Sequence, residues 1–438
     1  MLAVYLSPLY ILVNVYIFWR LIQWLSACHG LFGKRPVRVA AGLVYLFFAT
    51  SLLVGFFLPA GSLQRFFKSA GNYWLGVLLY AVLVLACAEL VRLAVWLRRR
   101  RGRRGETPEE ESPEDRSVVR RWRAIAGGAA ALLVTALSLW GVVNARIIHT
   151  TKYQVTVDKS AGELGDLRVV LTADLHLGYN IGCRQMEDMV EKINREDPDL
   201  VVIAGDIFDN EYEALEDPDR LAEILGGISA RYGVYACYGN HDIQEKILAG
   251  FTFGSKDGKK ESDPRMDAFL ERAGITLLQD EGVLVDDSFY LFGRADAGKP
   301  GRGITVRKTP EEITADMDQT KPVLVMDHEP EELQELADAG VDVDLGGHTH
   351  DGQMFPGNIV MKFLWENPCG YLKKDQMHSI VTSGAGLFGP NMRVGTKAEI
   401  CVVDIHFAGE ERREKRVPAR PPLLLCTEKN KSRKSDSN

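Results

Sequence analysis

The distribution of apolar and polar residues divides the chain into two parts. Residues 1–148 contain four apolar runs, each close to the roughly 20 residues that a helix needs to cross the hydrocarbon core of a membrane. The runs cover approximately residues 2–24, 37–59, 73–97 and 124–143. Four such runs in succession, with short connections, predict an N-terminal transmembrane region of four helices rather than the buried helices of a water-soluble domain.

The remainder of the chain has a different pattern, in which short apolar runs alternate with amphipathic segments. Runs of strand length are LRVVLTAD, LVVIAGD, GVYACYGN, PVLVMDH and VDVDLGG. Helical periodicity marks RQMEDMVEKINRED, DPDRLAEILGGISARYG, PRMDAFLERAG and PEELQELADAG. Two later segments, VLVDDSFYLFGRAD and AEICVVDIHF, are typical of strands joined directly. The pattern predicts a layered α/β domain over residues 149–410, followed by a polar, disordered tail at 411–438.

Charge separates the same two parts and predicts an orientation. Residues 1–150 carry 18 Lys and Arg against 7 Asp and Glu, although the whole chain has a net charge of −7. The linker 98–123 is rich in arginine and the connection after the first run has three basic residues, whereas the loop expected at 60–72 has two. By the positive-inside rule the first and third connections are cytoplasmic, so the α/β domain is expected outside the cytoplasm. The excess of Asp and Glu over Lys and Arg in this domain excludes electrostatic binding to nucleic acid.

Each of the five runs of strand length is closed or directly followed by Asp, Asn or His. These residues are Asp174, His176, Asp206, Asp209, Asn240, His241, Asp242, His328, His348 and His350. In open α/β sheets the carboxyl ends of the strands gather the functional residues. Carboxylate, amide and imidazole groups suit Mn²⁺, Fe or Zn²⁺ better than they suit a soft metal. The pattern therefore favours a metal site at this edge of the sheet.

The order of these blocks, D-x-H, G-D-x-x-D, G-N-H-D, a single His and G-H-x-H, resembles the calcineurin-like metallophosphoesterases. The resemblance covers roughly residues 165–408. The segments GQMFPG and VTSGAGLFGPNMRVGTKAEI are similar to the membrane-associated bacterial branch, which is itself similar to the transmembrane proteins with a metallophosphoesterase domain. The resemblance to this family implies an α/β/β/α fold. One departure is Asp351, where the branch commonly has Gly, and this carboxylate either tunes the metal site or caps the turn.

The resemblance implies that seven residues hold two divalent metal ions, Mn, Fe or Zn. The ligands expected of the first ion alone are Asp174, His176 and His350. The expected bridge between the ions is Asp206. The ligands expected of the second ion alone are Asn240, His328 and His348. Two cations about 3.5–4 Å apart can each hold a phosphate oxygen and share the hydroxide that attacks phosphorus.

Three further residues are expected close to the reacting phosphate. His241 is expected to act as proton donor or phosphate contact, oriented by Asp209 or Asp242. A supporting or helix-capping task is an equal alternative for the two carboxylates.

Together these features predict a multi-pass protein of the cell membrane that is a metal-dependent phosphoesterase. The resemblance favours a phosphodiesterase, with a lipid-linked or envelope phosphodiester as substrate and membrane lipids as neighbours. The alternative is a receptor or transport-associated protein that uses the domain to bind a phosphate ligand. The complete ligand set favours hydrolysis.

Overall fold

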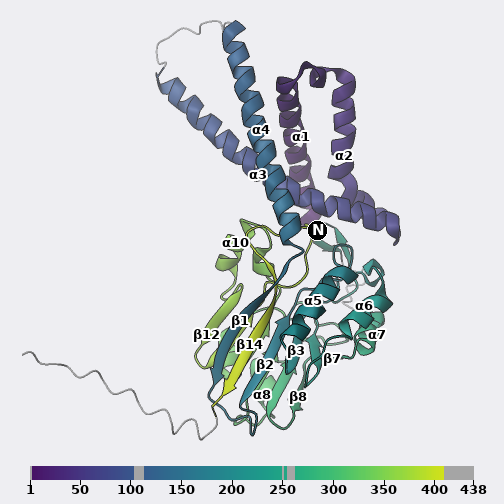
Figure 1. Ribbon diagram of the computed structural model, residues 1–438, viewed down its shortest axis with the longest axis vertical. Helices are drawn as coiled ribbons and strands as arrows, with labels where there is room; N and C mark the ends of the chain where they lie inside the picture. Colours follow the sequence, from purple (N-terminus) through teal and green to yellow (C-terminus); the bar gives the residue numbers. More distant parts are fainter. Residues whose placement is uncertain (1, 103–112, 249–250, 254–261, 409–438) are drawn as a thin grey trace, which may run out of the picture.

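The computed structural model describes residues 2–102, 113–248, 251–253 and 262–408. Figure 1 shows a helical region standing on one end of an α/β domain. The tail expected at residues 411–438 lies outside the described residues, as does the middle of the basic linker at 103–112.

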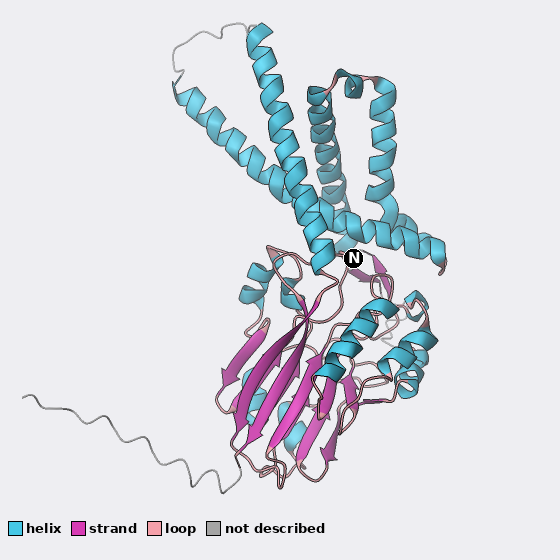
Figure 2. Ribbon diagram, in the orientation of Figure 1, coloured by secondary structure: helices cyan, strands magenta, loops and turns pink. Residues whose placement is uncertain are grey.

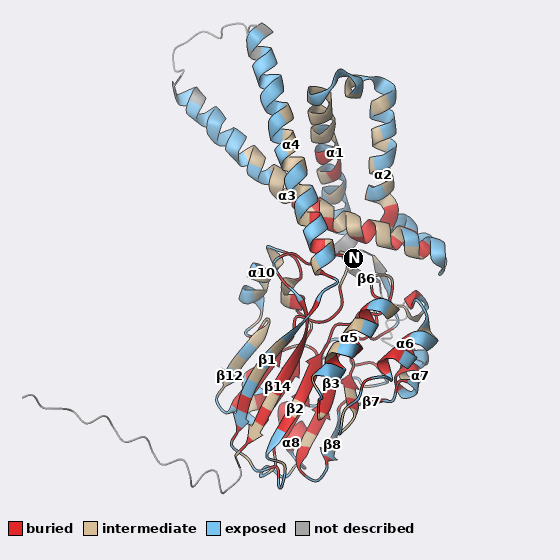
Figure 3. Ribbon diagram, in the orientation of Figure 1, coloured by how far each residue is buried: buried red, intermediate tan, exposed pale blue. Residues whose placement is uncertain are grey.

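Four long helices form the first part of the chain, joined in one place by a 3-10 turn, η1 (Gly30–Gly33). They are α1 (Leu2–Cys28), α2 (Arg35–Phe57), α3 (Ser62–Gly102) and α4 (Pro113–Asn144). Within the described residues, these are the helices that are long and apolar enough to cross a membrane. Most of their surface is exposed, as Figure 3 shows, because they pack on one another along narrow seams. The expectation of four long apolar helices is confirmed.

The prediction of a loop at residues 60–72 is wrong for most of its length, because residues 62–72 form the first turns of α3. Figure 1 shows this part of α3 lying across the end of the α/β domain before the helix rises away from it. Lys68 and Asn72 are buried, whereas Leu63 and Phe66 are exposed. The polar residues that interrupt the apolar pattern are therefore a helical surface that packs on the domain.

Two six-stranded sheets form the centre of the domain, in the orders β1-β14-β2-β3-β4-β7 and β12-β13-β11-β10-β9-β8. The first comprises β1 (Ile148–Val157), β2 (Asp166–Thr172), β3 (Leu200–Ala204), β4 (Val234–Cys237), β7 (Ile275–Leu277) and β14 (Ala398–Phe407). The second comprises β8 (Glu281–Val285), β9 (Phe289–Gly293), β10 (Val323–Met326), β11 (Val343–Gly346), β12 (Gly370–Lys374) and β13 (Met377–Val381). A small hairpin, β5 (Lys246–Leu248) and β6 (Phe251–Phe253), stands apart from both.

Helices cover the outer faces of the two sheets (Figure 2). Those on the first sheet are α5 (Cys183–Arg195), α6 (Pro218–Leu225) and α7 (Pro264–Arg272). Those on the second are α8 (Pro310–Thr314) and α9 (Leu333–Asp338). Between the sheets, alternate strand residues such as Leu171 and Leu324 are fully buried in a shared core. The predicted α/β/β/α layering is confirmed.

Local sequence explains how these helices begin. Asp217 accepts a hydrogen bond from the backbone N–H of Arg220 at the start of α6, and Asp263 does the same for Arg265 at the start of α7. Both caps are followed by proline at the first helical position, where its missing N–H has no intrahelical partner to lose.

Strand direction decides where the functional residues lie relative to the membrane helices. β1 receives the chain from α4 and runs away from the helices, and β14 is parallel to it. β2 is antiparallel to β14 and parallel to β3, so both return toward the helical end (Figure 1). The short elements η2 (Tyr212–Ala214), η3 (His350–Gly352) and α10 (Gly357–Leu364) follow strands or loops at that end. The carboxyl ends of the central strands thus face the long apolar helices.

Candidate metal centre

The loops that follow the central strands turn sharply at the residues singled out in the sequence. Asp174, His176, Asp206, His348 and His350 all have positive φ, between 45° and 71°. A side chain in this region costs about 1 kcal/mol or more per residue, so the conformation persists only where the surroundings enforce it. Five strained residues in three loops point their side chains into one small volume, which is typical of a pre-organised functional site.

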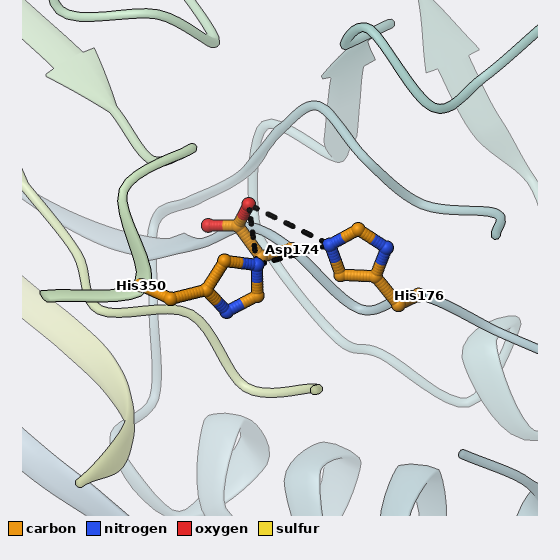
Figure 4. Close-up of side chains that lie close together, drawn as sticks. All are labelled: Asp174, His176 and His350. Atoms are coloured by element: carbon orange, nitrogen blue, oxygen red, sulfur yellow. Dashed lines mark hydrogen bonds and ion pairs between the residues drawn. The ribbon is translucent and has the colours of Figure 1, made fainter. Parts of the chain in front are cut away.

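The first cluster consists of Asp174, His176 and His350, which are all buried. The Nε2 atoms of the two histidines lie 3.0 Å apart, and His350 Nε2 lies 3.4 Å from Asp174 Oδ1 (Figure 4). The backbone N–H of His348 donates to both oxygens of Asp174, at 3.1 and 3.0 Å. Two imidazole nitrogens and one carboxylate oxygen thus face a common point, as the ligands of a single cation do.

The second cluster consists of Asp206, His328 and His348, joined by the side chain of Asn240. His328 Nε2 lies 3.1 Å from Asp206 Oδ2, 3.2 Å from Asn240 Oδ1 and 3.2 Å from His348 Nδ1. The other ring nitrogen of His328 lies 2.9 Å from the carbonyl oxygen of Ala204. A carbonyl can only accept, so Nδ1 carries a proton and Nε2 is the nitrogen that can bind a metal once it is deprotonated.

Asp206 adjoins both clusters. Its Oδ2 lies 3.1 Å from His328 Nε2 in the second cluster and 3.6 Å from His176 Nε2 in the first. Gly205 makes this approach possible, since it has φ +78° and a Cβ there would lie 2.5 Å from His328 Nδ1. The structure therefore brings the seven expected ligands together, divided as expected into two groups around one shared carboxylate. The arrangement is consistent with a binuclear metal site.

Asp209 and His241 form a third cluster with His176 beside the first. Asp209 Oδ1 lies 3.6 Å from Nδ1 of His176 and 3.6 Å from Nδ1 of His241. The ring of His241 also packs edge-on against Phe388, with centroids 4.9 Å apart. Asp209 therefore lies where it can orient both imidazoles.

Asp242 has a different setting from Asp209. Its two carboxylate oxygens accept the backbone N–H groups of Phe208 and Gly239, both at 2.8 Å. This side chain ties the loop after β3 to the loop after β4. Its geometry favours the supporting alternative over contact with substrate.

Burial and the charges of neighbouring side chains shift the pKa values of the residues in the clusters. Burial would raise the pKa of Asp206, but the charges of His328 and His241 hold it well below its usual range. Burial raises the pKa of Asp174 to about 6, although the charge of His328 opposes the shift. Burial and the charge of His328 lower the pKa of His348 to about 3. Binding of a divalent cation requires neutral imidazole and ionised carboxylate, so His328 has to release its Nε2 proton when a cation binds.

Four residues around the clusters were not predicted from the sequence. Phe388 packs on three of the histidines, and the ring of Trp365 lies 5.2 Å from that of His348. Glu329 Oε1 lies 3.6 Å from His348 Nε2, where it can fix the ring of this expected ligand. Glu329 had a local signal, since it follows His328 directly, and Phe388 lies in the segment VTSGAGLFGPNMRVGTKAEI, which resembles the bacterial branch.

The fourth is Arg393, a fully buried side chain. It donates to the carbonyl oxygens of His350, Ser383, Gly384, Gly386 and Lys397, and one guanidinium nitrogen lies 3.2 Å from His350 Nδ1. Arg393 therefore holds the loop after β13 in place next to His350 of the first cluster. Asp351, the departure noted in the sequence, is half-buried and belongs to none of the three clusters found among the described residues.

Comparison with known proteins agrees with this geometry. The profile of the family described as calcineurin-like phosphoesterase matches residues 167–352. The chain is 30% identical to a transmembrane protein with metallophosphoesterase domain of Danio rerio, over 62% of this chain and 60% of that protein. It is 26% identical to an uncharacterized metallophosphoesterase of Aquifex aeolicus, over 62% of this chain and 97% of that one.

A third relative is the UDP-2,3-diacylglucosamine pyrophosphatase LpxG of Chlamydia trachomatis, 23% identical over 48% of this chain and 70% of that protein. The matched region spans less than two thirds of the length of the Danio rerio protein. The facing sheets, the order of the strand-end residues and the matching profile together show that residues 167–352 of this chain are similar to the calcineurin-like phosphoesterase family.

Proposed function

We propose that this protein is a membrane-anchored, two-metal phosphodiesterase. The observation that carries the proposal is the pair of largely buried clusters that Asp206 adjoins. A structural metal site is closed by its own ligands and holds one ion, whereas two adjacent sites with a common carboxylate are typical of phosphoester hydrolysis.

The donor set fits two ions such as Mn, Fe or Zn. It offers carboxylate, amide and imidazole groups, and its tautomers are set by contacts such as that of His328 with Ala204. When bound, two such ions supply Lewis acidity to the phosphate oxygens and lower the pKa of a water that can attack phosphorus.

The remaining side chains act on the substrate and its proton. His241 is nearly buried, and Asp209 lies at its Nδ1, so Nε2 is the nitrogen available to protonate the departing alkoxide. Phe388 packs against the same ring and limits its rotation. Asp209 is a positioning residue in this scheme, and Asp242 holds the two loops together.

The position of the site supports a substrate carried by the membrane. Arg65 of α3 donates to the carbonyl oxygen of Gly178, two residues beyond His176, so the site lies at the end of the domain that contacts the membrane helices. The name of the Chlamydia relative describes a pyrophosphatase acting on a diacylated sugar nucleotide. We propose a lipid-linked or envelope phosphodiester as the substrate class.

The arginine-rich linker supports an orientation with the domain outside the cytoplasm. A cysteine introduced at Val306, which is 82% exposed, tests it. A membrane-impermeant maleimide is expected to label this cysteine in intact cells. Labelling only after the cells are opened would reverse the proposed orientation.

Hydrolysis is tested with the full-length chain, loaded with Mn²⁺ and supplied with bis-p-nitrophenyl phosphate. Turnover is expected, and Asp206→Asn and His348→Ala are expected to abolish it. His406→Ala is the matched control, because this exposed histidine pairs with Asp166 away from the clusters. Full metal occupancy without turnover of any ester would favour the alternative, a module that binds a phosphate ligand.

A further inference from the structure

Helix α10 carries an exposed apolar face that the fold of the domain does not explain. Its sequence is GNIVMKFL and none of its residues is buried. Ile359 and Val360 are exposed, Phe363 is 85% exposed and Leu364 is 67% exposed. Large apolar side chains gathered in this way on a short helix mark a surface that contacts something other than water.

The position of α10 is fixed by its contacts with the membrane helices. Met354, just before α10, packs with Tyr80 of α3, and the Tyr80 hydroxyl donates to the carbonyl oxygen of Phe355 at 3.3 Å. The same cluster includes Met392 and Val394, which lie against Gly76 of α3 and Gly141 of α4. Figure 1 accordingly shows α10 at the level where α4 meets the domain.

The exposed residues at the end of α4 indicate which environment surrounds the protein at the level of α10. Trp140, Val143 and Ile147 are exposed apolar residues there, and they belong to or directly follow a helix that is apolar enough to cross a membrane. Tryptophan is enriched where a membrane meets water. An exposed apolar helix held beside this point lies at the depth of the lipid headgroups and the first acyl carbons.

We propose that α10 is an interfacial helix, whose face of Ile359, Val360, Phe363 and Leu364 is buried in the acyl chains of the leaflet next to the α/β domain. Its composition fits this occupant, since its one charged residue, Lys362, is exposed and can reach the headgroups. The proposal stands whether or not the enzyme acts on a lipid.

The same helix links the leaflet to the metal centre. Trp365 is the residue at the end of α10, and its ring lies 5.2 Å from that of His348. Lipid contact at Phe363 and Leu364 is therefore two residues and one residue away from Trp365, whose side chain touches an expected metal ligand. α10 would hold the site against the membrane surface.

Site-specific photocrosslinking of the full-length chain tests the proposal. p-Benzoylphenylalanine is placed at position 363, and the protein is reconstituted in nanodiscs of phosphatidylethanolamine and phosphatidylglycerol. Irradiation is expected to add a phospholipid mass to the peptide that contains α10. Replacing an exposed phenylalanine by this analogue leaves the core of the domain unchanged.

The matched control places the same analogue at Leu284, which is 42% exposed on β8. Leu284 pairs with Tyr290 at the start of β9, so it lies at the end of the sheet opposite the metal ligands. Background adduct formation is expected there. Equal lipid adducts at both positions, no lipid adduct at position 363, or a crosslink from position 363 to a second copy of the chain would each overturn the proposal.

Discussion

An ion pair between α3 and the loop that follows β3 allows a test of whether the helical region stabilises the loops of the metal centre. Lys68 lies 2.9 and 3.0 Å from the two carboxylate oxygens of Glu211, and its ammonium group lies 4.0 Å from the ring centroid of Tyr179. Tyr179 also donates its hydroxyl to Glu211. Glu211 is two residues beyond Asp209, so the pair connects α3 to the third cluster.

Lys68→Met removes the cation and leaves a largely buried carboxylate. Removing one partner of a buried ion pair costs about 3–5 kcal/mol. The side chains of Lys68 and Glu211 are 6% and 16% exposed, so water reaches the carboxylate in part, and Tyr179 still donates to it. We therefore expect a cost of about 2 kcal/mol, equivalent to about 30-fold more frequent opening of the loop.

Hydrogen–deuterium exchange of the full-length chain in nanodiscs measures this opening. The peptide spanning residues 205–217 is expected to exchange about 30-fold faster in Lys68→Met and in Glu211→Gln, with little further change in the double variant. Lys192→Met is the control, because Lys192 and Asp188 form a half-exposed pair on α5, with side chains 26% and 41% exposed. Unchanged exchange in Lys68→Met, or additive effects in the double variant, would refute the reasoning.

Three further predictions concern the centre and its surroundings. Asp209→Asn is expected to keep both metal ions but to lower hydrolysis about 10²–10⁴-fold, because His241 loses its orientation; metal loss would contradict this. Glu329→Gln is expected to weaken Mn²⁺ binding about 10–100-fold in a metal titration, and unchanged affinity would refute a role in orienting its neighbour. Burial and the charge of Asp327 raise the pKa of Asp344 to about 7. Ionisation of this carboxyl then favours the unfolded chain increasingly from about pH 4 to 7, so Asp344→Asn is expected to raise the melting temperature at pH 8 but not at pH 4.

The gathering of the expected ligands at one edge could be predicted from the sequence because each of them follows a buried strand almost directly. Asp174 comes two residues after β2, Asp206 two residues after β3, and His328 two residues after β10. Parallel strands bring their carboxyl ends to one edge, so the local pattern was enough to place these residues together. A layered α/β domain followed from the same alternation of apolar strands and amphipathic helices, whereas the α/β/β/α order was implied by the resemblance.

Other features depend on contacts between distant segments, which no local pattern reports. Arg393 lies in an irregular loop, and its partners include His350, 43 residues earlier. β1 follows the last membrane helix, and only its pairing with β14 makes it part of the sheet. The first turns of α3 were read as a loop because their polar residues, including Lys68, pack on a domain that comes much later in the chain.

Electron paramagnetic resonance of the Mn²⁺-loaded full-length protein tests the proposal that Asp206 would serve both metal sites. Two Mn²⁺ ions per chain are expected, with the spectrum of an exchange-coupled pair, and this coupling is expected to be lost in Asp206→Asn. Binding of a single ion, or of two ions with uncoupled spectra, would contradict it.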